Sequence, residues 1–138
     1  MSTTIRPEVS MKNKYWIERH RYYELKHFCL QYDIWKQAYE GLTGLAAANL
    51  DAVFSKTNSM SNPVEKCVEA REYYYTRINM IEKAADETDS SIGQYILMAV
   101  TKGYSYDILL ARTSIPCCKD TYYELYRRFF WILNKIRK

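Results

Sequence analysis

The chain has few residues that break helices and no pattern typical of a β-sheet. Only four glycines and three prolines occur among its 138 residues. No segment alternates apolar and polar residues as a half-buried strand would, and no Asn-Gly pair marks a hairpin. Apolar residues recur instead at the spacing of helices. These features predict an all-α fold, built as a multi-helix domain.

Signals for secretion and for membrane insertion are also lacking. The chain shows no signal peptide and no apolar run near the roughly 18 residues that a transmembrane helix needs. Its four cysteines have no C-x-x-C spacing. We therefore expect a cytoplasmic protein with reduced thiols and no membrane partner. Cys117 and Cys118 are adjacent, and we expect packed or half-exposed thiols there rather than a redox switch.

Motifs of catalysis and of metal binding are absent too. The sequence has no phosphate-binding loop, no H-E-x-x-H motif and no nucleophile elbow. His20, His27 and Cys29 lie near one another, but no fourth residue has the spacing of a zinc ligand. Asp86 and Glu87 form a carboxylate pair that is ordinary at a helix end. We expect no enzyme activity, no bound metal and no cofactor.

The apolar pattern divides the chain into three parts. Residues 1–12 are polar and without period, so they are expected to form a flexible N-terminus. Residues 13–61 form an N-terminal helical part, whose last stretch, 55–61, is a polar linker. Residues 62–138 form a long helical arm followed by the C-terminal helices.

Helices of the N-terminal part are expected over residues 13–31 and 34–40, the second capped by Asp33. The first has two apolar sides and needs two packing partners. One side comprises Trp16, Tyr23, His27 and Leu30, and the other Tyr22, Leu25, Phe28, Cys29 and Tyr32. The long helix from Pro63 carries a seam of residues three and four apart. Its members are Val64, Cys67, Arg71, Tyr74, Ile78, Ile81 and Ala85. This seam favours an intramolecular core, with a homodimer zipper as the alternative.

The last third of the chain has the layout of a short helix, a turn and a basic helix. Gly103 ends the preceding helix, Ser105 caps the next, and Asp107 adds a favourable negative charge to its first turn. Pro116 separates this helix from one that begins near Cys118. The apolar side of the short helix is expected to be Ile108, Leu109 and Ala111. This arrangement predicts a C-terminal helix-turn-helix.

The same stretch predicts its own core and an outer face. The core is expected to contain Ile96, Val100, Leu109, Ile115, Tyr122 and Phe129. On the last helix the inward side comprises Tyr122, Leu125, Tyr126, Phe129, Leu133 and Ile136. Trp131 falls on the opposite, outer side, where a large apolar residue indicates that something covers it. The N-terminal helix and a second subunit are the two candidates.

The net charge of +4 is concentrated on the last helix. Residues 119–138 carry the basic side chains Lys119, Arg127, Arg128, Lys135, Arg137 and Lys138, against only Asp120 and Glu124. A local excess of positive charge is what a polyanionic partner requires. It would equally suit a solubilising tail that complements the helix dipole. Charge alone does not separate these two interpretations.

Two stretches carry a resemblance to a known family. The pattern G-x-S-Y-D over 103–107, followed by Leu109, Ile115 and Thr121, resembles region four of sigma factors. IPCCKDTYY at 115–123 and RRFFW at 127–131 resemble small sigma-like proteins of Gram-positive prophages, related to the RinA and ArpU type of late transcription regulators. YELKHFCLQY at 23–32 is similar to the same group. The resemblance implies a sigma region four-like helix-turn-helix that regulates transcription on double-stranded DNA.

A helix-turn-helix meets base edges with the first turns of its second helix. Candidate DNA-binding residues are therefore Lys119, Asp120, Tyr123, Glu124, Arg127 and Arg128. Lys119 and Arg127 can donate to guanine or to phosphates, and Asp120 or Glu124 can accept from a cytosine amino group. Asp120 has a competing role as a first-turn carboxylate that caps the helix, and we favour that role.

A second hypothesis has the same genetic setting but a protein partner. A phage protein of this size could bind and inhibit a host protein, either RNA polymerase or a defence nuclease such as a CRISPR effector. The abundance of tyrosine, 14 of 138 residues, suits such an interface. Its candidate residues are Phe130, Trp131 and Asn134.

Overall fold

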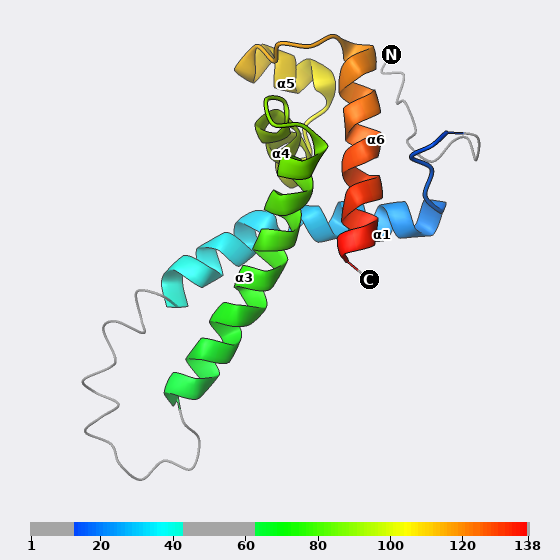
Figure 1. Cartoon of the computed structure of the whole chain (residues 1–138). Coiled ribbons are helices and arrows are strands. Elements are labelled where there is room, and N and C mark those ends of the chain that lie inside the picture. Colours follow the sequence, from blue (N-terminus) through cyan, green and yellow to red (C-terminus); the bar gives the residue numbers. More distant parts are fainter. Residues whose placement is uncertain (1–12, 43–62, 138) are drawn as a thin grey trace. The chain divides into compact units, whose positions relative to one another are not determined.

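The computed structural model describes residues 13–42 and 63–137, and every regular element in these residues is a helix. The elements are α1 (Arg19–Leu30), a helical segment over residues 32–42, α3 (Pro63–Thr88), α4 (Gly93–Lys102), α5 (Tyr106–Thr113) and α6 (Lys119–Ile136) (Figure 1). No strand occurs in the described residues, which confirms the all-α prediction. The expected flexible residues 1–12 and the expected linker 55–61 lie outside the described part.

The chain divides into two compact units. The first unit comprises Met1–Gln31 and Met80–Lys138, and the second comprises Tyr32–Asn79. The N-terminal part of α3, up to Asn79, therefore belongs to the second unit, and the rest of α3 belongs to the first unit. The boundary between residues 61 and 62 that the sequence predicts lies outside the described residues and stays a prediction.

α1 begins later than the sequence predicts. Glu18 is its N-cap, and the Glu18 carboxylate accepts a hydrogen bond from the Arg21 backbone N–H at 3.1 Å. The predicted start at Asn13 is wrong, because the Asn13 side chain accepts from the Tyr15 N–H at 2.8 Å and closes a turn instead. Of the two predicted apolar sides, the structure buries Tyr22, Leu25, Phe28 and Cys29. Tyr23 and Leu30, on the other side, are 38% and 37% exposed.

The next helical segment also differs at its start. It begins at residue 32, directly after the C-cap Gln31, so Asp33 lies inside the segment and not at the N-cap position. The chain resumes helical geometry after one residue, Gln31, so the segment begins two residues earlier than predicted. Farther on, the Asp89 carboxylate accepts from the N–H groups of Ser91 and Ile92, both at 2.8 Å, and starts α4. Donation from the Ile92 N–H is the main reason that the pKa of Asp89 is lowered.

α4 and α5 follow the predicted caps. Gly103 ends α4 in the left-handed conformation with a φ of 74°, and the Ser105 hydroxyl accepts from the Ile108 N–H at 3.3 Å. The predicted apolar side of α5 is wrong in part. Tyr106 and Leu109 are its buried residues, whereas Ile108 is 45% exposed and Ala111 is exposed. The helix is thus rotated about its axis relative to the prediction, so that Tyr106 and Leu109 point inward and Ile108 and Ala111 point outward.

The first unit has one apolar core in which α1 packs on α4 and α6, and α4 packs on α5 and α6. All six residues predicted for the core of the last three helices are buried: Ile96, Val100, Leu109, Ile115, Tyr122 and Phe129. On α6 the structure also buries Phe130 and Ile132, so its buried face is wider than predicted. Leu125, Tyr126 and Ile136 are half-buried.

Candidate nucleic-acid interface

The turn between α5 and α6 is held from the inside of the first unit. Ile115 is 4% exposed and fills the turn with an apolar side chain. The Tyr106 hydroxyl donates to the Cys117 carbonyl at 2.6 Å, and the Tyr106 ring lies 5.3 Å from the Tyr122 ring. Burial is the main reason that the pKa of Tyr106 is raised. The start of α6 is therefore fixed on the start of α5.

Two adjacent cysteines sit between the turn and α6 in different surroundings. Cys118 is the exposed N-cap of α6, and its Sγ lies 3.2 Å from the Thr121 hydroxyl. The interaction with this hydroxyl is the main reason that the pKa of Cys118 is lowered. Cys117 is half-buried, and burial raises the pKa of its thiol. Both thiols are free in the structure.

The first two turns of α6 present polar side chains. Lys119 is half-buried, and Asp120 is exposed. The Asp120 carboxylate has no hydrogen-bond partner in the described part of the chain, and Cys118 occupies the cap position, so Asp120 does not cap the helix through a hydrogen bond. It does lie in the first turn of α6, where the helix dipole favours a negative charge. Tyr123 is half-buried because its ring packs at 5.1 Å from Tyr122 and 6.1 Å from Tyr126.

Arg127 and Glu124 form an ion pair on this face. The Arg127 guanidinium lies 3.4 Å from the Glu124 carboxylate, and the side chains are 17% and 46% exposed. Because α6 places these residues one turn apart, the pair follows from helix geometry. Arg127 must leave or bridge Glu124 before it contacts another anion. Lys119 and Arg127 are thus balanced by Asp120 and Glu124 on the candidate face.

Arg128 does not join the other five candidate residues. Its guanidinium donates to the Tyr15 hydroxyl at 3.2 Å, and this hydrogen bond lowers the pKa of Tyr15. Tyr15 lies in the segment before α1, so Arg128 holds that segment on α6. The sequence places Arg128 among DNA contacts because it shows charge and periodicity but not the path of residues 13–18.

The N-terminal segment also covers Trp131. The rings of Tyr15 and Trp131 lie 5.5 Å apart, edge to face, and the Lys135 ammonium lies 3.3 Å from the centre of the Trp131 ring. Two candidates were predicted to cover Trp131, and the N-terminal part of the chain is the one observed. The residue that covers it, Tyr15, precedes α1. Phe130 is 1% exposed and packs on Tyr22, so its assignment to a protein interface is wrong.

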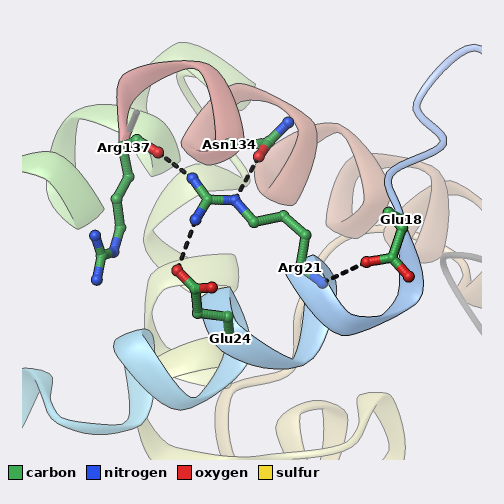
Figure 2. A network of polar contacts seen from close by, with 5 residues as sticks. All are labelled: Glu18, Arg21, Glu24, Asn134 and Arg137. Carbon is green, nitrogen blue, oxygen red and sulfur yellow. Dashed lines mark hydrogen bonds and ion pairs between the residues drawn. The ribbon is translucent and has the colours of Figure 1, made fainter.

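Asn134, the third interface candidate, belongs to a polar network between α1 and α6 (Figure 2). Arg21 donates from Nε to the Asn134 side-chain oxygen at 2.7 Å and pairs with Glu24 at 2.6 Å. It also donates to the Arg137 backbone carbonyl. The Arg137 guanidinium lies 4.3 Å from the centre of the Phe28 ring. The basic end of α6 thus serves contacts within the first unit.

One basic residue outside the predicted candidate set lies beside the turn. Arg112 is exposed in the last turn of α5, and its guanidinium lies 5.2 Å from the Tyr104 ring. The first helix of a helix-turn-helix crosses the DNA backbone, so a cation at its end can contact a phosphate. The position of Arg112, a basic residue just before the predicted turn, was the signal in the sequence that could have added it to the candidate residues.

Comparisons with known proteins do not indicate a function for this face. No protein-family model, curated protein or solved structure matches the chain. In residues 13–42 and 63–137, no three His, Cys, Asp or Glu side chains are grouped to hold a metal ion. None of the helices in these residues has the length and apolar character of a membrane span.

Proposed function

We propose that the chain is a phage-type DNA-binding transcription regulator that uses α5, the turn and α6 as a helix-turn-helix. The observation that carries the proposal is the fixed start of α6. Ile115 and Tyr106 hold it from inside, while Asp120 is exposed and Lys119 and Glu124 are partly exposed. A reader of base edges needs this combination of a rigid support and outward polar side chains.

The proposed contacts follow from the chemistry of these side chains. α6 enters the major groove, which is about as wide as an α-helix with its side chains. Lys119 donates to guanine or to a phosphate, and Glu124 accepts from a cytosine amino group. Arg112 and Arg127 contact phosphates on the two sides of the groove. The acidic residues reduce attraction to DNA of other sequences, because they repel the phosphate backbone.

The direct test is binding to the DNA that flanks the chain's own gene, measured at several salt concentrations. Lys119→Ala should weaken specific binding by about 1–3 kcal/mol if the ammonium contacts a base. Arg112→Ala should weaken binding to all DNA sequences alike, and it should reduce the slope of log affinity against log salt concentration by about one. Lys66→Ala is the control, since Lys66 is an exposed lysine of the second unit. Unchanged binding by both test variants would contradict the proposal.

A protein partner is the second candidate function, and the charge balance of the same face favours it. Asp120 and Glu124 offset Lys119 and Arg127, and a near-neutral polar face suits a protein surface better than a polyanion. This hypothesis keeps RNA polymerase or a host defence nuclease as the inhibited partner. It predicts weak, sequence-independent DNA binding, together with a protein complex that survives moderate salt.

A further inference from the structure

The second unit carries an open hollow on the surface of α3. Its volume is about 290 Å³, and it is lined by Tyr39, Val68, Arg71, Glu72 and Tyr75. Tyr39 comes from the segment 32–42, and its ring lies 6.1 Å from the Tyr75 ring and 5.6 Å from the Arg71 guanidinium. The other four residues come from α3. Val68 and Tyr75 are 52% and 54% exposed, so the hollow has apolar walls that face solvent.

Opposite charges lie side by side in this hollow. Arg71 and Glu72 both line it, and neither forms an ion pair with a residue in the described part of the chain. Neighbouring residues on a helix do not face each other, so the two side chains cannot satisfy one another well. The Arg71 Nε is buried and has no hydrogen-bond partner among the described residues. The hollow therefore offers one cation and one anion to an occupant.

The four α3 residues are arranged symmetrically about the midpoint between positions 71 and 72. Val68 lies three positions before Arg71, and Tyr75 lies three positions after Glu72. When two copies of such a helix pack antiparallel around a two-fold axis at this midpoint, each residue meets its counterpart. Val68 of one copy then lies opposite Tyr75 of the other, and Arg71 lies opposite Glu72.

We propose that a second copy of this chain docks in the hollow through antiparallel pairing of α3. A two-fold interface must be complementary to itself, and the hollow meets this requirement with one charge of each sign and two apolar residues. Each dimer would contain two Arg71–Glu72 ion pairs. A partner of one charge sign would leave either Arg71 or Glu72 unmatched. The volume lies just below the range for small-molecule pockets, about 300–1,000 Å³, and suits an inserted side chain such as Tyr75.

The test is the oligomeric state of the full chain, measured by sedimentation over a concentration series without DNA. The wild type should form dimers as the concentration rises. Arg71→Glu alone and Glu72→Arg alone should each raise the dimer dissociation constant at least about tenfold, because like charges then face each other. The double variant R71E/E72R should restore dimers. An equimolar mixture of the two single variants should form heterodimers, since one copy then carries two anions and the other two cations.

Several results would overturn the proposal. A wild type that stays monomeric at every concentration would assign the hollow to another occupant, such as a different protein or residues 43–62 of the same chain. If both single variants still form dimers as the wild type does, the two copies contact each other at another surface. Because Arg71 packs on Tyr39, circular dichroism must show that each variant is folded. Glu72→Arg provides an independent variant, since the Glu72 side chain is exposed. The assay contains no DNA, so its failure is distinct from failure of the proposed DNA-binding function.

Discussion

The hydroxyl groups of Tyr22 and Tyr126 lie 2.8 Å apart and join α1 to α6 inside the first unit. Both rings also pack on Phe130, at 5.1 Å and 4.9 Å between ring centres. Burial, followed by the neighbouring Tyr22, raises the pKa of Tyr126 well above its ordinary value. This part of the contact between the two helices therefore combines aromatic packing with a hydrogen bond in apolar surroundings.

Removal of this hydrogen bond should destabilise the first unit. Tyr22→Phe keeps the ring but takes away the partner of the Tyr126 hydroxyl, so the free energy of unfolding should fall by about 1 kcal/mol. The double variant Y22F/Y126F should lose less than the sum of the single variants, because it leaves neither hydroxyl behind. Urea denaturation measures both changes. Tyr23→Phe is the control, because Tyr23 is 38% exposed on the same helix.

Two tyrosines of α6 also predict how stability depends on pH. Burial is the main cause of the raised pKa values of Tyr122 and Tyr126 in the folded protein. The folded state thus holds these protons more tightly than the unfolded state. The stabilisation is fully present below the ordinary tyrosine pKa of about 10 and is lost as the pH rises above it. Urea midpoints measured from about pH 8 to about pH 11 should decline, and Tyr126→Phe should make the decline shallower.

Gly93 is expected to tolerate no side chain. A Cβ at this position would collide with the backbone carbonyl of Ala85 near the end of α3, and backbone cannot move aside as a flexible side chain can. Gly93→Ala should therefore cost about 1–3 kcal/mol of stability. Gly41→Ala is the matched control, because a Cβ there meets nothing within 4 Å. Equal thermal midpoints for the two variants would show that α3 and α4 can separate without cost.

Ile115 should be the most sensitive residue of the turn between α5 and α6. It is 4% exposed, and Ile115→Ala should lower the free energy of unfolding by about 2–4 kcal/mol through lost burial and a cavity. Ile34→Ala makes the same chemical change at a position that is 67% exposed and should have little effect. Chemical denaturation of both variants checks the difference. A wild-type midpoint for Ile115→Ala would mean that the turn is not held by its apolar residue.

Sequence reasoning succeeded where a few neighbouring residues decide the outcome. The left-handed Gly103 and the capping Ser105 depend only on local backbone chemistry, and both were predicted correctly. The six core residues of the last three helices were also predicted correctly, because their spacing repeats at the helical period. The rotation of the short helix α5 was not, since eight residues define its inward side poorly.

The contacts at the candidate site that the sequence did not predict have a different cause. Phe130 and Arg128 appeared available because periodicity does not show which part of the chain crosses α6. Phe130 is buried against Tyr22 of α1. Arg128 forms a hydrogen bond with Tyr15, which precedes α1. Both contacts join residues more than a hundred positions apart. Such contacts depend on the path of the whole chain, which local patterns do not contain.

The uneven burial of α3 has a consequence for its motion. No residue from Glu65 to Arg77 is buried, whereas Ile78, Ile81, Ala84 and Ala85 are. A helical segment with few buried apolar contacts loses its backbone hydrogen bonds in local fluctuations. A segment that packs in a core loses them only when the core itself unfolds. Amide hydrogens in the first part of this helix should exchange with solvent much faster than those near its end. One continuous helix would thus fray from its N-terminal end, and a bound second copy would be seen as slowed exchange around residues 68–75.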